Sequence, residues 1–206
     1  MTNEVIEVIA QYPVLAKQIH LPMQSGDDKV LIKMNRKHNM KKYREIVHSI
    51  RRLIPEATLF TDIIVGVTGE TEEQFENTRK AMEEFKFNMS YTAMYSPRPG
   101  ATSHRWDDDV PQDEKKRRLH ILTEELRKHN RIYTRQLEGK TLRVLVRGAD
   151  RKEGYLSAIT EGKLIVRFPS RNQNLIGQFA DVKISSASDF SLEGKYISQK
   201  QSVMAY

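Results

Sequence analysis

Thr58-Leu-Phe-Thr-Asp-Ile-Ile-Val65 is the stretch of this sequence that decides the fold. It is almost continuously apolar and rich in β-branched residues, which is typical of a strand covered on both faces. Residues 66–70 then turn the chain, and Thr71-Glu-Glu-Gln74 has the pattern of a capping box that opens a helix. A buried strand followed by a short turn and a helix is the unit from which parallel sheets are built.

The segments around this strand repeat the alternation of strand and helix. Short extended stretches precede and follow it, and residues with one apolar helical face lie between them. The predicted strands cover residues 17–23, 58–65 and 87–95, and the predicted helices cover residues 40–54, 71–85 and 111–137. This order predicts an α/β fold with parallel β/α units.

The chain changes character after residue 140. Five short strand candidates follow one another with glycines between them, which is typical of a small all-β barrel or sandwich. These candidates cover residues 141–146, 154–159, 163–168, 178–184 and 190–197. We therefore expect an α/β domain over residues 1–137, a β domain over residues 138–200 and a tail over residues 201–206.

The composition excludes several classes of protein. The 206 residues contain no cysteine, so within them there is no disulfide, cysteine nucleophile, thiolate zinc site or cysteine-ligated iron–sulfur cluster. The longest apolar runs are as short as Ile63-Ile64-Val65, so no membrane-spanning helix is predicted. The first residues carry acids where a signal peptide carries bases, so we expect a cytoplasmic protein.

The net charge of +7 is unevenly distributed along the chain. Residues 29–52 contain nine Lys and Arg against one acid, and residues 115–135 contain eight against two. Basic blocks of this size suit a polyanion such as RNA, because each neutralised phosphate releases counterions. The alternative is that these side chains only solvate the exposed faces of helices.

Polar residues follow each predicted strand of the α/β domain. Gln24 and Ser25 come after the first strand, Gly66 after the second, and Ser96 and Arg98 after the third. The carboxyl ends of parallel strands are where such sheets bind ligands, and the arginine fork suits a carboxylate or a phosphate. The alternative is that each segment is an ordinary turn. The six histidines have no spacing typical of a metal site, and no serine lies in a GxSxG setting.

Four motifs, in this order, resemble one family. They are HLPMQSG over residues 20–26, KMNR over residues 33–36, TDIIVGVTGETEEQF over residues 61–75 and YSPRPGA over residues 95–101. Together they resemble the C-terminal half of the radical S-adenosylmethionine (SAM) methylthiotransferases, and the segment after Leu137 resembles their RNA-binding TRAM domain. SPRPG combined with TDIIVG is most similar to the branch that acts on isopentenylated adenosine beside the anticodon of tRNA.

This resemblance implies the C-terminal half of a partial (β/α) barrel followed by a five-stranded TRAM barrel. It implies methylthio transfer to C2 of N6-isopentenyl (dimethylallyl) adenosine, with SAM and two 4Fe-4S clusters as cofactors of the parent enzyme. Family members hold each cluster with three cysteines, so we expect this chain to be a fragment that holds no cluster and is inactive alone. The SAM contacts implied are Gln24, Ser25, Gly66, Ser96 and Arg98.

The partners implied are the anticodon stem-loop of tRNA and the N-terminal part of the same protein. The RNA contacts are assigned to eight basic residues of the β domain: Lys140, Arg143, Arg147, Arg151, Lys152, Lys163, Arg167 and Arg171. Without the early strands of the barrel, we also expect the chain to self-associate. Gly66-Val-Thr-Gly-Glu70 departs from the usual GFPGE, and Pro99-Gly-Ala-Thr102 departs from the usual PGT, which weakens the transfer of individual residue roles.

Three other interpretations stay open. One is a non-catalytic RNA-binding module that uses the basic helices and the β domain alone, and a CxxxCxxC motif upstream would decide for the enzyme. Another is a methylthiotransferase that acts on a ribosomal protein. The third is a different radical SAM enzyme, such as an oxygen-independent porphyrinogen oxidase, against which the C-terminal β domain argues.

Overall fold

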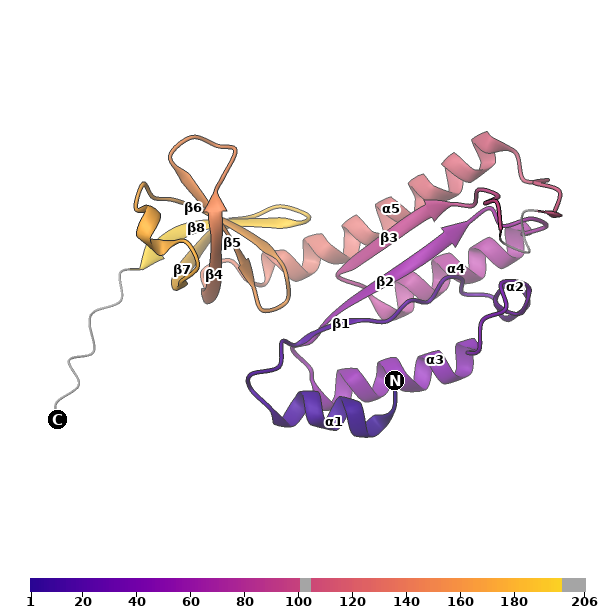
Figure 1. The fold of residues 1–206 in the computed structure, drawn as a ribbon, viewed down its shortest axis with the longest axis horizontal. Helices are drawn as coiled ribbons and strands as arrows, with labels where there is room; N and C mark the ends of the chain where they lie inside the picture. The colour runs from indigo at the N-terminus through magenta and orange to yellow at the C-terminus, as the bar shows by residue number, and fades with distance from the viewer. Residues whose placement is uncertain (101–104, 198–206) are drawn as a thin grey trace. The chain divides into compact units, whose positions relative to one another are not determined.

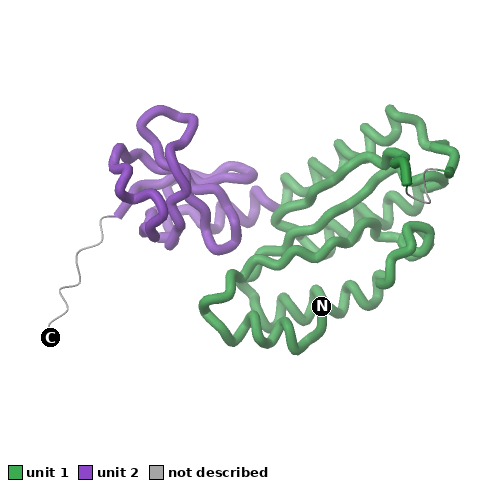
Figure 2. The backbone as a smooth tube through the Cα atoms, in the orientation of Figure 1, with its two compact units in different colours: residues 1–129 green, residues 130–206 purple. Residues whose placement is uncertain are grey.

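The computed structural model describes residues 1–100 and 105–197, and the chain divides into two compact units (Figure 2). The first unit covers residues 1–129 and the second covers residues 130–206. No helix in the described residues is both long and apolar enough to cross a membrane.

The first unit is built on a three-stranded parallel sheet with the strand order β1-β2-β3 (Figure 1). The strands are β1 (Gln18–His20), β2 (Thr58–Val65) and β3 (Met89–Met94), and the helices are α1 (Asn3–Gln11), α2 (Asp28–Lys33), α3 (Met40–Leu53) and α4 (Glu72–Phe85). The helix α5 (Gln112–Arg135) begins in this unit and ends in the second. The predicted α/β order is confirmed.

Local sequence explains where these elements begin. Thr71 Oγ1 accepts from Gln74 N over 3.3 Å, and Gln74 Oε1 accepts from Thr71 N over 3.0 Å, so the predicted capping box is confirmed. Helix α3 starts at Asn39, whose Oδ1 accepts from Lys42 N over 2.9 Å. Strand β2 is buried along nearly its whole length, as its apolar run predicts.

The sequence analysis did not predict the two helices α1 and α2. Helix α1 carries the apolar residues Val5, Ile6, Val8 and Ile9, of which only Ile6 is buried. Helix α2 has six residues and depends on the Asp27 side chain, whose Oδ1 accepts from Lys29 N and Val30 N over 3.0 and 3.1 Å. A helix this short is stable only through such caps and tertiary contacts.

The second unit is a closed five-stranded barrel with the strand order β4-β5-β6-β8-β7. Its strands are β4 (Thr141–Ala149), β5 (Tyr155–Thr160), β6 (Ile165–Pro169), β7 (Phe179–Ala187) and β8 (Ser191–Ile197), with the 3-10 turn η2 (Gln173–Leu175) before β7. Alternate side chains fill the interior, including Val144, Phe168 and Val182. At Gly194 a Cβ would lie 2.5 Å from the Lys183 carbonyl oxygen, so only glycine lets β7 and β8 approach this closely. The predicted small β-barrel is confirmed.

Candidate functional site

The loops that follow the three parallel strands lie at one edge of the sheet, because parallel strands end on the same side. Gln24 forms an isolated parallel bridge with Ile63, which places the loop after β1 beside β2. Tyr95 N donates to Val65 O over 2.8 Å, which places the loop after β3 beside the end of β2. Gly66 follows Val65 directly, so the structure brings the three predicted loops together.

Gln24 fixes the backbone of the first loop to β2. Its N donates to Asp62 O over 2.8 Å, and its O accepts from Ile64 N over 2.9 Å. The residue is buried and has a φ of 71°, a left-handed conformation that is uncommon for a residue other than glycine. Such backbone strain is concentrated at functional sites.

Ser25 and Gly26 pack against helix α4. Ser25 is fully buried, its Oγ lies 3.3 Å from Thr78 Oγ1, and it accepts from Asp27 N over 3.2 Å. Gly26 N donates to Thr78 Oγ1 over 2.9 Å, and a Cβ on Gly26 would lie 2.5 Å from Thr78 Cα. The contacts of Ser25 within the chain therefore shape the loop, and position 26 requires glycine because the helix backbone is so close.

The second loop is held by a buried carboxylate and a buried guanidinium. Glu70 Oε2 accepts from Gly66 N over 2.6 Å and from Arg118 Nη1 over 2.8 Å. Arg118 Nη1 also donates to Glu70 O over 3.0 Å, and its Nε donates to Glu114 Oε1 over 2.7 Å. Burial raises the pKa of Glu70, although the Gly66 N–H and Arg118 act in the opposite direction.

Lys115 joins the second loop to the third. Its side chain is 1% exposed, and its Nζ donates to Tyr95 O over 3.2 Å and lies 2.5 Å from Asp108 Oδ1. The lysine stem covers Gly66, where a Cβ would lie 2.4 Å from Lys115 Cγ. Gly66 is therefore required by the approach of the lysine as well as by its φ of 69°.

A second lysine closes the same loop from the side of α2. Lys33 Nζ donates to Thr68 O over 2.5 Å, and Gly69 N donates to Asp109 Oδ1 over 2.6 Å. Thr68 Oγ1 is buried, and no described residue forms a hydrogen bond with it. The loop is thus rigidly held and keeps one buried hydroxyl that a ligand can satisfy.

The third loop presents Ser96 and Arg98 to solvent. Arg98 forms no ion pair or hydrogen bond with another residue of the described ranges 1–100 and 105–197. An exposed guanidinium fork of this kind can bind a carboxylate or a phosphate in two parallel hydrogen bonds. Ala101 and Thr102 of the predicted motif lie outside the described residues.

The donor set at this edge does not fit an iron–sulfur cluster. The chain has no cysteine, and its described residues contain no group of three or more His, Cys, Asp or Glu side chains placed to hold a metal ion. The edge does carry groups of the kind that bind a polar organic ligand, because the guanidinium of Arg98 and the hydroxyl of Ser96 are exposed there.

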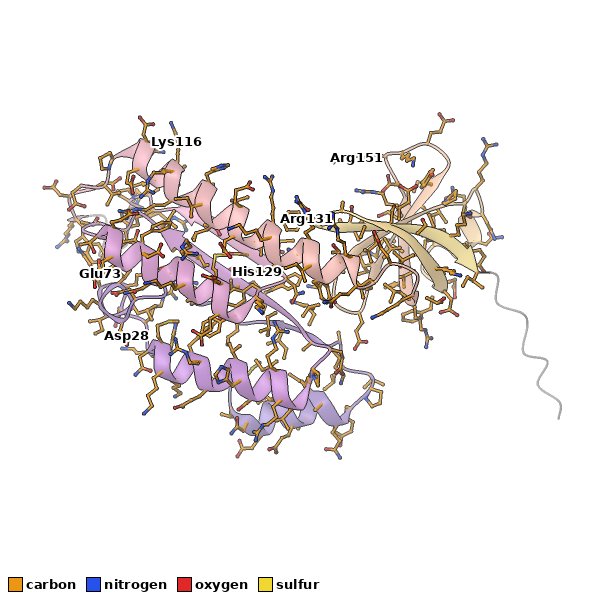
Figure 3. The ribbon with its side chains drawn as sticks, turned by 180° about the vertical axis from the view of Figure 1, so that it is seen from behind. Asp28, Glu73, Lys116, His129, Arg131 and Arg151 are labelled. Carbon is orange, nitrogen blue, oxygen red and sulfur yellow. The ribbon has the colours of Figure 1, made fainter. Side chains whose placement is uncertain are left out.

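The eight basic residues predicted to bind RNA all lie on the barrel unit, and all except the half-buried Arg167 are exposed. Two of them are paired within the chain: Lys152 Nζ lies 3.3 Å from Glu193 Oε1, and Arg167 Nε lies 2.9 Å from Asp150 Oδ2. The other six form no ion pair with a described residue: Lys140, Arg143, Arg147, Arg151, Lys163 and Arg171. Figure 3 marks Arg151 on the loop between β4 and β5. These six remain available to a polyanion.

The basic block of helix α5 behaves differently. Seven of its eight cations, from Lys115 to Arg131, form ion pairs with acids of the described chain. Many of these pairs join residues three or four positions apart on the helix, as for Arg127 and Glu124. For this helix the structure favours the alternative interpretation, in which the charges serve the protein itself.

Three residues that matter at these sites were not predicted from the sequence. Lys115 and Arg118 were counted among the basic residues of a solvent-facing helix, yet both are buried. Their spacing of three residues on α5 places them on one face, which was the available signal. Phe179 was also missed, although strand alternation places it on the same outer face as Asp181 and Lys183.

Two family models match the chain. The model of the radical SAM superfamily matches residues 1–82, and the model of the TRAM domain matches residues 135–197. The parallel sheet with polar loops at its carboxyl edge is thus part of a radical SAM domain, and the closed barrel is a TRAM domain.

Several curated proteins are similar to nearly the whole chain. It is 40% identical over 197 residues to the tRNA-2-methylthio-N(6)-dimethylallyladenosine synthase of Cronobacter sakazakii, covering 95% of this chain and 41% of that protein. It is 43% identical over 193 residues to the protein of the same name in Oceanobacillus iheyensis, covering 93% of this chain and 37% of that protein. The chain therefore resembles the radical SAM methylthiotransferases through both units, and it spans about two fifths of the length of these relatives.

Proposed function

We propose that this chain is part of an enzyme that adds a methylthio group to C2 of N6-isopentenyl (dimethylallyl) adenosine beside the anticodon of tRNA. The observation that carries the proposal is the similarity of about 40% identity that extends through both units to relatives named for this activity. A tRNA substrate of this kind implies a cytoplasmic enzyme. Both of these relatives are named for an activity on tRNA, and neither name refers to a ribosomal protein or to another radical SAM substrate.

In this proposal the carboxyl edge of the sheet binds SAM. Arg98 binds the carboxylate of SAM, and Ser96 and Gln24 contribute polar contacts around it. Ser25 and Gly66 act on the shape of the loops, because the hydroxyl of one is bonded to Thr78 and the other makes room for the Lys115 stem. When bound, SAM supplies the methyl group and the radical chemistry, and the protein supplies its binding and orientation.

The barrel unit binds the anticodon stem-loop of tRNA in this proposal. Its support is the set of six basic residues without an ion-pair partner among the described residues, together with the TRAM match. The cysteine-free composition supports a second candidate, in which the chain alone acts as an RNA-binding module. Association with a second copy or with another part of the same protein remains a prediction, supported by the exposed Tyr91 on the edge strand β3.

A chimera tests the proposed activity. Residues 1–206 would replace the matching part of the Cronobacter sakazakii relative, and the 2-methylthio content of tRNA would be measured by mass spectrometry in cells lacking the native enzyme. We expect modification to be restored. If a folded chimera with its clusters bound leaves tRNA without the methylthio group, the proposed enzyme activity is wrong. The proposal that the chain is an RNA-binding module would then be favoured.

Within the same chimera, Arg98→Ala tests the SAM assignment. Loss of a charge-assisted hydrogen bond is expected to raise the KM for SAM by about 10- to 100-fold, with a smaller rise in Arg98→Lys. Lys80→Ala, an exposed cation on α4, is the matched control and is expected to leave the KM unchanged. Equal KM values for Arg98→Ala and Lys80→Ala would exclude Arg98 from the site.

A further inference from the structure

Phe179 is an exposed aromatic residue at the start of strand β7. Its side chain is 56% exposed, whereas Phe168 of the same barrel is fully buried. Among the described residues of the barrel unit, it is the one aromatic side chain with more than half of its surface exposed. The exposed ring is thus accessible to a binding partner.

The strand register places Phe179 in an apolar row on the outside of the barrel. Phe179 is paired with Leu145, Leu145 with Ile159, and Ile159 with Ile165, so the row crosses β7, β4, β5 and β6. Ile165, at the far end of the row, is 40% exposed. The outer face of the barrel thus has a row of apolar side chains that is one residue wide and crosses four of the five strands.

The backbone around Phe179 is firmly held. Gly177 N donates to Val146 O over 2.9 Å, and Val146 N donates to Gln178 O over 3.0 Å. Gly177 has a φ of 80°, which turns the chain from η2 into β7. The ring is therefore presented by a rigid strand end, which lowers the entropy lost on binding.

One cation, Arg143, lies against the ring. The Arg143 guanidinium lies over Phe179, 4.5 Å from the ring centroid, although Asp181 is its direct partner across the β4–β7 ladder and forms no ion pair with it. Arg147 lies two residues beyond Leu145 on the same outer face of β4, and it is exposed. An exposed aromatic ring with an arginine against it suits a base that carries its own phosphates.

We propose that Phe179 and Arg143 form a stacking site for an unpaired nucleotide of RNA. The inference rests on the proposed RNA partner and adds to it a preference for single-stranded loops over duplex. Bases within a duplex are stacked on each other and offer no free face, whereas loop bases can be splayed out onto an aromatic ring. A protein partner for the apolar row is the competing occupant.

The full chain would be titrated with two RNAs of equal length at low salt, one a hairpin with an unpaired loop and the other a blunt duplex. Phe179→Leu is expected to weaken hairpin binding by about 5- to 100-fold, because stacking is worth about 1–3 kcal/mol per base, and to change duplex binding less than about twofold. Ile165→Ala, at the other end of the row, is the matched control and is expected to retain hairpin binding.

A direct readout comes from Phe179→Trp in a Trp106→Phe background, since Trp106 is the single tryptophan of the chain. Stacking of a base is expected to quench the new tryptophan with the hairpin and not with the duplex. Equal affinities of Phe179→Leu and the parent chain for the hairpin, without quenching, would overturn the stacking site alone and leave the apolar row to a protein partner. If the parent chain binds neither RNA, the proposal that the barrel unit binds RNA is wrong as well.

Discussion

The loops at the sheet edge and the outer face of the barrel use the same residue types in opposite ways. At the sheet edge, Lys115 and Arg118 are 1% and 5% exposed, and each is paired with an acid that belongs to a neighbouring loop. On the barrel, Arg143 and Arg147 are exposed, and neither is paired with an acid of the described chain. Both regions contain several basic residues, but Lys115 and Arg118 are paired with acids, whereas Arg143 and Arg147 are not paired with an acid of the described chain.

The difference follows from the cost of desolvation. A buried cation is tolerated only when an acid and further hydrogen bonds compensate for its lost hydration. Its charge therefore interacts with that acid and positions the loop that carries it. An exposed cation keeps its hydration and its attraction for a polyanion. Pairing within the chain, more than the number of basic residues, therefore separates positioning groups from candidate RNA contacts.

The largest expected effect comes from breaking the buried pair. Arg118→Met leaves Glu70 buried without its cation, and we expect a loss of about 4 kcal/mol in the free energy of unfolding of the first unit. Trp106 lies in that unit, so its fluorescence during denaturant unfolding measures the loss. Lys80→Met, which replaces an exposed cation of the same unit, is the matched control, with an expected change below about 0.5 kcal/mol.

The same variant has a defined pH dependence. Removing Arg118 raises the pKa of Glu70 further, so the cost of the buried carboxylate is present at high pH and disappears as the pH falls below that raised pKa. The loss in Arg118→Met is therefore expected to be larger at pH 8 than at pH 5. An equal loss at both values would show that the side-chain packing of Arg118, and not its charge, stabilises the loop.

A smaller effect is expected at Glu114, the partly exposed acid beside this pair. Its hydrogen bonds with Arg117, and then those with Arg118, lower the pKa of Glu114 to about 2. The ionised form therefore stabilises the fold above the ordinary glutamate pKa of about 4.3, and this contribution is lost as the pH falls toward 2.

Glu114→Gln is expected to cost about 1–2 kcal/mol at pH 6, after allowance for solvent screening, and progressively less between pH 4.5 and pH 2. Acid unfolding followed by circular dichroism measures this. Glu83→Gln is the control, because Glu83 is 59% exposed and pairs with Arg79 at 3.2 Å; its expected change is below about 0.5 kcal/mol. A pH-independent difference for Glu114→Gln would contradict the assigned linkage.

The smallest effect on stability, and a specific effect on binding, is expected at Arg147. Arg147→Gln should change the free energy of unfolding by less than about 0.5 kcal/mol. It should reduce the slope of log affinity against log salt for an anticodon stem-loop by about 1, because one phosphate contact is lost. Arg127→Gln, an exposed cation of α5 already paired with Glu124 at 2.5 Å, should leave the slope unchanged. Equal slopes for both variants would remove the contrast between paired and unpaired cations.

Much of the architecture could be predicted from local patterns. The run from Thr58 to Val65, the capping box at Thr71 and the alternation of the β segments after residue 140 each specify an element within a few residues. Helix α2 escaped prediction because its stability comes from the Asp27 cap and from Met40 N, which donates to Asp28 Oδ1 over 2.7 Å. A contact between separate segments produces no hydrophobic periodicity within the sequence of the helix, so the helix cannot be predicted from its own residues.

The sequence by itself determined the absence of cysteine ligands, the basic balance, the order of the strands and of helices α3, α4 and α5, and the polar residues that follow each parallel strand. These are properties of composition and of short windows, where backbone geometry and hydrophobic period act locally. The tertiary structure alone decided which charges are buried and paired, and that Arg143 lies over Phe179. Burial and pairing depend on contacts between segments far apart in the chain. Two side chains of the same type therefore differ in free energy when one is buried and loses its hydration while the other stays exposed to water.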